Sequence, residues 1–273
     1  MAKLKIGIVG CGAIGSSLAK AVVKDFSKEA RLCGLFDLDR AKARSLSCRL
    51  SGSGRLAARD LRELIERSEL VIEAAAAKFS WEIARAALSR GRDVMIMSVG
   101  GVADKLAELA ALTRKKRARA YVPSGAISGL DAVKAASLGR IKKVVLTTTK
   151  SPLSFKGVKY VLDKGIDPAK IKKDTVLFSG KASEAVKYFP QNINVAASLS
   201  LAGIGIGKTR VRIIASPGTS RNIHEIRVGS SAGEIFTRTE NVLHPDNPKT
   251  SYLAVLSAMA MLKQILEPVR IGT

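Results

Sequence analysis

The segment Lys5–Gly15, KIGIVGCGAIG, constrains the fold of this chain more than any other feature. A short apolar run leads into Gly10, Gly12 and Gly15 at GxGxxG spacing, and a helical pattern, Ser16–Lys24, follows at once. Between a strand and a helix, such glycines give a tight turn, close approach to a pyrophosphate and close helix–strand packing. The N–H groups that open the helix then stabilise the phosphate charge. The alternative is a glycine-rich turn in a nucleotide-free α/β domain, and the strand–turn–helix context favours a dinucleotide. The predicted cofactor contacts in this turn are Gly10, Gly12, Ala13, Ile14 and Gly15.

Asp37 ends the next apolar run, 22 residues after Gly15. A carboxylate at this place accepts hydrogen bonds from the ribose hydroxyls of NAD and repels the 2′-phosphate of NADP. Arg40, Lys42 and Arg44 follow closely and offer cations to a 2′-phosphate. We therefore predict NAD binding with Asp37 as a cofactor contact, and NADP stays open.

Apolar runs alternate with helical patterns throughout the first half of the chain. This order predicts a Rossmann-type, doubly wound parallel sheet in an α/β protein. The expected strands are Lys5–Val9, Arg31–Phe36, Leu70–Glu73, Val94–Met97 and Ala118–Val122. The expected helices are Ser16–Lys24, Arg40–Leu50, Leu61–Arg67, Trp81–Ser89 and Ala103–Thr113.

The pattern changes after Ser124. Several later runs alternate polar and apolar residues, as half-exposed antiparallel strands do. We expect strands at Lys142–Thr149, Arg210–Ala215, Arg221–Val228 and Glu234–Val242, and helices at Gly125–Leu138, Ser183–Phe189, Val195–Leu201 and Thr250–Leu266. The second half is therefore predicted to be an α+β substrate domain with a mostly antiparallel sheet.

The change of pattern also sets the expected domain boundaries. Residues 1–124 form the dinucleotide-binding domain, and residues 125–248 form the substrate domain. Residues 249–273 contribute a final helix that we expect to return to the Rossmann domain.

Composition excludes several classes of protein. Cys11, Cys33 and Cys48 show no CxxC or Cys/His spacing, so we expect no metal site and free, mostly buried thiols. No apolar region with a cleavage site precedes the fold, so we expect a cytoplasmic protein that does not enter a membrane. The net charge of +23 raises the question of nucleic-acid binding, but aromatic residues are only 4% and no recognition motif is present. We therefore interpret the charge as a basic surface that attracts anionic substrate and cofactor.

Four later segments, together with the glycine turn and in the same order, resemble the L-aspartate dehydrogenase family of NAD(P)-dependent enzymes of NAD biosynthesis. They are Ser124–Asp131 (SGAISGLD), Pro190–Ala197 (PQNINVAA), Asn222–Ile226 (NIHEI) and Asn247–Leu253 (NPKTSYL). The resemblance implies oxidation of L-aspartate to iminoaspartate in a homodimeric enzyme.

The resemblance also implies roles for single residues. It makes His224 the catalytic acid/base, which suits a reaction that must remove an ammonium proton near neutral pH. The other histidine, His244, lies beside Pro245 in a polar segment and is expected on the surface. Ala126, Asn192 and Asn194 are the implied contacts to the nicotinamide end of the cofactor. Candidates for holding the substrate carboxylates are Asn222, Lys249, Thr250 and Ser251.

Two other kinds of function stay open on the sequence. One is a different oxidoreductase of the same plan, of the homoserine or dihydrodipicolinate type, although the lysine-rich helix and paired histidines of those enzymes are not found. The other is a non-enzymatic NAD-sensing or nucleic-acid-binding module, which the high positive charge suggests.

Overall fold

A computed structural model describes residues 2–189, 194–245 and 247–272, apart from the side chains of residues 248 and 249. The chain divides into two compact units. The first unit comprises Met1–Pro123 with Val255–Ile271, and the second comprises Ser124–Ala254 with Gly272–Thr273.

The first unit is built on a five-stranded sheet in the order β2-β1-β3-β4-β5, with every neighbouring pair parallel. Its strands are β1 (Leu4–Val9), β2 (Ala30–Phe36), β3 (Leu70–Glu73), β4 (Asp93–Ile96) and β5 (Ala120–Tyr121). The direction of strand addition reverses between β1 and β3, and ligands of doubly wound folds bind at the carboxyl ends of such strands. The predicted Rossmann-type sheet is confirmed.

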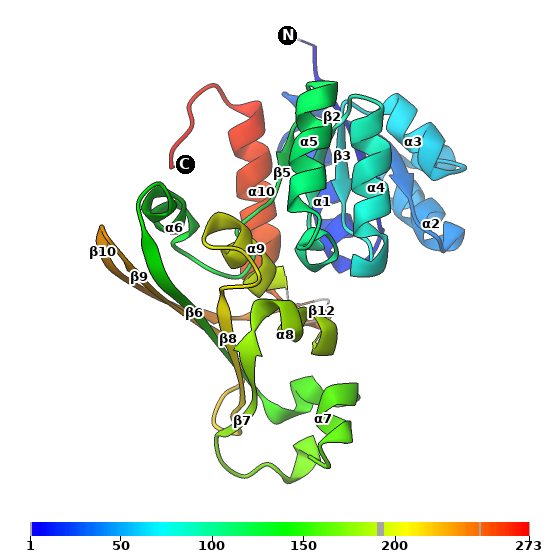
Figure 1. Cartoon of the computed structure of the whole chain (residues 1–273). Helices are drawn as coiled ribbons and strands as arrows, with labels where there is room; N and C mark the ends of the chain where they lie inside the picture. The colour runs from blue at the N-terminus through cyan, green and yellow to red at the C-terminus, as the bar shows by residue number, and fades with distance from the viewer. Residues whose placement is uncertain (1, 190–193, 246, 273) are drawn as a thin grey trace. The chain divides into compact units, whose positions relative to one another are not determined.

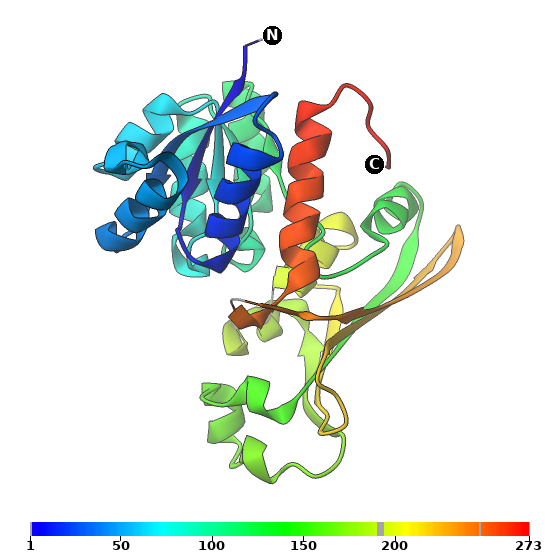
Figure 2. The ribbon, with the colours of Figure 1, turned by 180° about the vertical axis from the view of Figure 1, so that it is seen from behind.

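Helices cover both faces of this sheet. They are α1 (Ala13–Lys24), α2 (Arg40–Ser51), α3 (Leu61–Arg67), α4 (Ala77–Ser89), α5 (Leu106–Lys116) and α10 (Tyr252–Leu266), with short 3₁₀ helices at Gly54–Leu56 and Val99–Val102. Figure 1 shows α4 and α5 in front of the strands, and Figure 2 shows α1 and α10 on the other side. Leu18 of α1, Leu46 of α2 and Leu262 of α10 pack in one core with Ile8 of β1. The last helix therefore belongs to the core of the first unit.

The second unit contains a five-stranded sheet in the order β10-β9-β6-β8-β7. Only the pair β6–β8 is parallel, so the predicted α+β unit with a mostly antiparallel sheet is confirmed. The strands are β6 (Ile141–Lys150), β7 (Thr175–Lys181), β8 (Arg210–Ala215), β9 (Asn222–Ser230) and β10 (Gly233–Asn241). The helices are α6 (Leu130–Ser137), α7 (Lys159–Asp163), α8 (Ala182–Tyr188) and α9 (Asn194–Ala202), with 3₁₀ helices at Pro152–Phe155 and Pro168–Lys170.

Three predicted helices begin later than expected, and the first of them is α5, which begins at Leu106 instead of Ala103. The helix expected over Gly125–Leu138 begins at Leu130, because Gly125 and Gly129 have φ values of +69° and +78° and form a turn. The helix expected from Thr250 begins at Tyr252. The preceding segment forms strand β12 (Asn247–Ser251), which pairs with β11 (Leu243–His244) in a small sheet.

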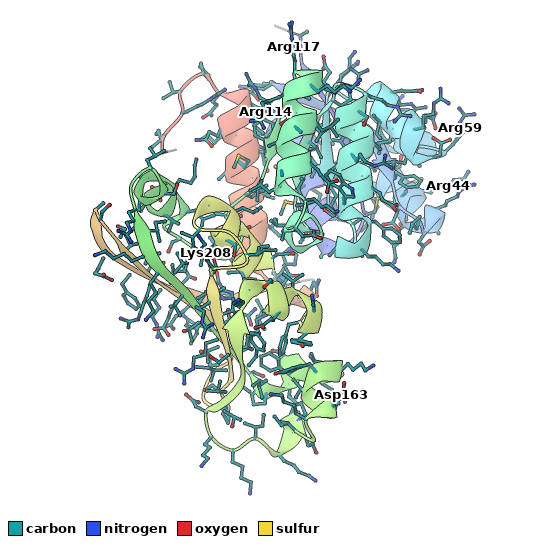
Figure 3. The ribbon with its side chains drawn as sticks, in the orientation of Figure 1. Arg44, Arg59, Arg114, Arg117, Asp163 and Lys208 are labelled. Atoms are coloured by element: carbon teal, nitrogen blue, oxygen red, sulfur yellow. The ribbon has the colours of Figure 1, made fainter. Side chains whose placement is uncertain are left out.

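The surface is strongly basic. Figure 3 shows Arg44, Arg59 and Arg117 extending away from the ribbon, and all three side chains are exposed. Of the three cysteines, Cys11 is buried, but Cys33 is half-buried and Cys48 is exposed, so the expectation of mostly buried thiols was wrong. Within the described residues, no helix is long and apolar enough to cross a membrane. The same residues contain no group of three or more His, Cys, Asp or Glu side chains that could hold a metal ion.

Candidate active site

The glycine turn joins β1 to α1 at the reversal point of the first sheet. Gly10 has φ +96°, and a Cβ there would lie 2.8 Å from the amide nitrogen of Ala75 and closer still to the carbonyl of Ala74. A Cβ on Gly15 would overlap the carbonyl oxygen of Gly10. These two glycines therefore allow the turn to pack against the end of β3 and against the first turn of α1.

Gly12 has a different environment. It precedes α1, it is exposed, and a Cβ built on it would have no atom within 4 Å. Ala13 and Ile14 are the first residues of α1, whose leading N–H groups have no partner within the helix. Open space in front of such N–H groups fits a pyrophosphate, so the turn has the form that a dinucleotide requires.

Asp37, which follows β2, forms hydrogen bonds that stabilise the glycine turn. Its carboxylate accepts a hydrogen bond from the backbone N–H of Cys11 at 2.7 Å and one from the N–H of Asp39 at 2.9 Å. A carboxylate has about four acceptor positions, so ribose hydroxyls can be bound in addition. Burial, helped by the charge of Asp37, raises the pKa of the Cys11 thiol to about 12, which keeps this thiol neutral beside the phosphate position.

A buried carboxyl at the end of β3, Glu73, was not found from the sequence. One of its oxygens accepts from the N–H of Ala75 at 2.8 Å. The other accepts from the Ser80 hydroxyl at 2.9 Å and the Ser98 N–H at 3.0 Å. Burial raises the pKa of Glu73, while these hydrogen bonds act in the opposite direction. Glu73 thereby ties the ends of β3 and β4 to α4, next to the turn that Gly10 contacts.

In the second unit, His224 lies in β9 and is only 3% exposed. Its Nδ1 atom is 2.9 Å from the hydroxyl of Thr148, the residue directly opposite on β6. When Nδ1–H donates to Thr148, the lone pair of Nε2 is left to accept a proton.

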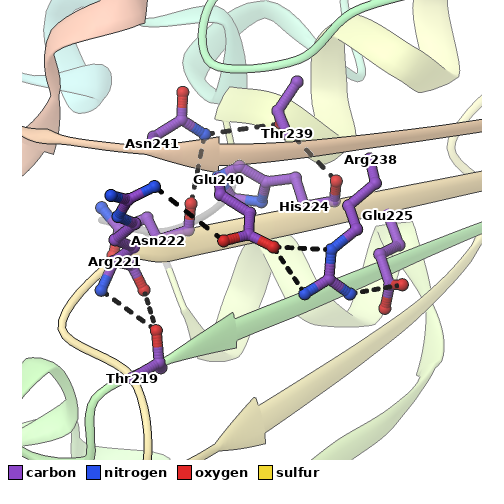
Figure 4. Close-up of polar contacts among 9 residues, drawn as sticks. All are labelled: Thr219, Arg221, Asn222, His224, Glu225, Arg238, Thr239, Glu240 and Asn241. Carbon is purple, nitrogen blue, oxygen red and sulfur yellow. Dashed lines mark hydrogen bonds and ion pairs between the residues drawn. The ribbon is translucent and has the colours of Figure 1, made fainter.

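Amide and hydroxyl groups of β10 lie next to the main chain of His224 and Asn222 (Figure 4), and the Thr239 hydroxyl donates to the His224 carbonyl oxygen at 3.5 Å. The Asn241 amide donates to the carbonyl oxygens of Ala126 at 3.0 Å and Asn222 at 3.2 Å. Thr239, opposite His224 in the sheet, donates to the carbonyl of Ala126 at 3.0 Å. On its other side the Asn222 amide donates to the Ser251 hydroxyl at 3.2 Å. The structure thus brings Ala126, Asn222, His224 and Ser251 together.

The electrostatics of this cluster depend on a lysine that the sequence did not single out. Lys150 ends β6 and is 7% exposed. Burial lowers the pKa of Lys150 to about 8. Burial, together with the positive charge of Lys150, lowers the pKa of His224 to about 3. The imidazole is therefore neutral at physiological pH in the ligand-free protein.

The remaining predicted cofactor and substrate residues are Asn192, Asn194, Lys249 and Thr250. Asn194 is the exposed first residue of α9, and Thr250 accepts a hydrogen bond from the Asn247 amide within β12. Asn192 and the side chain of Lys249 lie outside the described residues.

The expected surface position of His244 was wrong. This histidine is 4% exposed, because β11 pairs with β12 and the ring packs 5.6 Å from that of Tyr252, centroid to centroid.

Comparison with known proteins finds a matching family model for each half of the chain. A family model described as the NAD binding domain of homoserine dehydrogenase matches residues 10–123, and one described as the C-terminal part of aspartate dehydrogenase matches residues 131–265. An L-aspartate dehydrogenase from Methanocella arvoryzae is 47% identical over 271 residues, which are 98% of this chain and 99% of the relative. The chain belongs to the L-aspartate dehydrogenase family.

Other members of this family agree with the assignment. The L-aspartate dehydrogenase of Methanosarcina barkeri is 46% identical and covers 99% of this chain and 100% of its own length. The crystal structure of aspartate dehydrogenase from Thermotoga maritima superposes with a TM-score of 0.73 at 26% identity, covering 99% of this chain and 100% of that one. The resemblance found from the sequence motifs is confirmed.

Proposed function

We propose that the protein is an L-aspartate dehydrogenase, oxidising the amine of L-aspartate with NAD(P) to give iminoaspartate. The observation that carries the proposal is a buried, neutral imidazole, His224, in a unit whose sequence matches the aspartate dehydrogenase model. Iminoaspartate then enters NAD biosynthesis or is hydrolysed to oxaloacetate and ammonia.

The residues proposed to bind the cofactor phosphates and ribose belong to the first unit, and the proposed acid/base belongs to the second. NAD(P), when bound, supplies the hydride acceptor. The glycine turn and Asp37 would hold its pyrophosphate and ribose, and the Asp37 carboxylate supports a preference for NAD. His224 takes the proton from the substrate ammonium, which leaves the amine lone pair to assist loss of hydride from Cα. The hydrogen bond to Thr148 fixes the ring orientation during this transfer. Once the imidazolium has released this proton to solvent, the neutral imidazole can accept a proton from the water that attacks the imine.

We also propose a homodimer in the cytoplasm. Helices α6, α8 and α9 cover one face of the second sheet. The alternate residues of β6 and β9 on its other face, such as Val145 and Ile223, are half-buried within this unit, which supports contact with a second copy. Three free thiols support a reducing compartment. Light scattering of the purified protein measures its mass in solution.

The reaction is tested by following NAD(P)H absorbance with a panel of amino acids and both cofactors. We expect oxidation of L-aspartate and a fall in turnover on the order of 10²–10⁴-fold in His224→Ala, because a positioned acid/base contributes that much. NAD binding should be retained. Lys134→Gln is the control, since this residue of α6 is exposed and is not part of the sheet. A folded, NAD-binding His224→Ala protein with wild-type turnover would contradict the assignment.

A further inference from the structure

The buried face of the second sheet changes from apolar to polar along its strands. On β6, Val144 and Leu146 belong to the hydrophobic core, and the next two residues on the same face are Thr148 and Lys150. On β9, Val228 and Ile226 belong to that core, and His224 and Asn222 continue the face. All four of these polar residues are buried. Thr148, His224 and Asn222 are hydrogen-bonded within the protein. Polar residues that replace the apolar pattern of a buried face are typical of functional sites.

Lys150 is the most unusual member of this polar end. Among the described residues it is the only lysine or arginine that is buried, although the chain has 46 of these residues. It lies two residues beyond Thr148 and therefore on the same face of β6. Its main chain is fixed, because its carbonyl accepts from the N–H of Ser216 at 2.9 Å and the residue pairs with Ala215 of β8. The strand register thus places Lys150 next to His224 on this face, and the lysine charge acts on the imidazole.

Among the described residues, the strands of the second sheet place no acidic side chain on the face that carries Lys150. His224 and Lys150 are the only ionisable groups that β6, β8, β9 and β10 place on this face, as the strand register shows. The acidic residues of β9 and β10 lie on the opposite face, where Glu225 and Glu240 pair with Arg238 (Figure 4). β12 carries no acidic residue. A buried, positively charged face of this kind is complementary to an anion.

We propose that the Lys150 ammonium is the receptor for one carboxylate of the dicarboxylate substrate, on the same sheet face as His224. The inference rests on the proposed function and names the substrate group that Lys150 recognises. A substrate carboxylate bound there would form an ion pair with the ammonium, and this pair would offset the desolvation of the carboxylate. It also connects binding to catalysis. A bound carboxylate offsets the charge of Lys150, and the imidazole then becomes a stronger base only when substrate is present.

The binding test uses succinate, a dicarboxylate that has no amine to oxidise. Calorimetric titration of the NADH-saturated protein should show a dissociation constant for succinate raised on the order of 10²-fold in Lys150→Met, because a buried charge pair has lost one partner. Lys134→Met is the matched control, since it removes the same group from an exposed position of α6. Circular dichroism and NADH binding check that each variant is folded, and Lys150→Gln provides a second neutral side chain.

The kinetic test compares L-aspartate with its two monoamides, L-asparagine and L-isoasparagine. In Lys150→Met the preference for aspartate over at least one monoamide should fall on the order of 10²-fold, and that monoamide identifies the carboxylate bound. Unchanged succinate affinity and unchanged preferences in a folded variant would overturn the proposal. Lys150-dependent succinate binding in a wild-type protein that does not oxidise aspartate would support the carboxylate receptor and reject the proposed reaction.

Discussion

The chemistry of His224 depends most directly on the hydroxyl group of Thr148. A neutral imidazole in a buried site can expose either nitrogen as the base, and its partner selects the tautomer. Thr148→Val keeps the shape of the side chain but removes the partner of Nδ1. We expect turnover to fall tenfold or more, on the order of the loss of one buried hydrogen bond. Thr148→Ser retains the hydroxyl and should stay close to wild type in the same steady-state assay, and equal loss in both variants would argue against this role.

The low pKa of His224 also makes folding stability depend on pH. The imidazole is protonated below about pH 6.5 in the unfolded chain but only near pH 3 in the folded protein. The unfolded state therefore binds more protons in this window, and stability falls as pH falls, by at most about 1.4 kcal/mol per pH unit from this group.

His224→Asn removes the titrating group while keeping an amide that can donate to Thr148. Urea unfolding at pH 7, 6 and 5 should show wild type losing stability relative to His224→Asn as the pH is lowered. Parallel pH profiles for the two proteins would mean that the imidazole is not buried in its neutral form.

The ends of β3 and β4 illustrate how one side chain organises several elements. Glu73 accepts hydrogen bonds from the turn after β3, from α4 and from the segment after β4. Glu73→Ala leaves two buried donors and one half-buried donor without this acceptor, and we expect a loss of about 2 kcal/mol or more of unfolding free energy. It should also weaken NAD binding, because the same turn packs against Gly10. Glu82→Ala, an exposed change in α4, is the control for both chemical denaturation and NAD titration.

The sequence predicted the elements that local patterns determine. The glycine spacing and the alternation of strands and helices gave the first sheet, and the NIHEI segment gave His224. Lys150, Thr239 and Asn241 could not be found in this way, because their roles depend on which strands lie next to β9 and in what register. Strand β7 was missed for the same reason, since it pairs with β8, a segment distant in sequence. His244 was placed on the surface because its polar neighbours hide the pairing of β11 with β12.

At the scale of the whole molecule, the outstanding property is a charge of +23. The surface carries this excess, whereas Lys150 is the one buried cation of the described residues. Exposed and buried charges act differently, since salt screens interactions at the surface over about 10 Å at 0.1 M but affects a buried pair much less. The surface charge is therefore expected to concentrate anionic ligands near the protein, and Lys150 to hold them at a specific position.

This difference can be measured through ionic strength. L-aspartate and NAD both carry net negative charge, so the basic surface should raise their local concentration at low salt. Raising KCl from about 20 mM to about 0.5 M should lower kcat/KM for L-aspartate several-fold, while kcat changes little because the buried site is shielded. Sucrose at matched osmolarity is the control, since it leaves charge interactions unscreened. A kcat/KM that does not respond to KCl would show that the surface charge has no part in substrate capture.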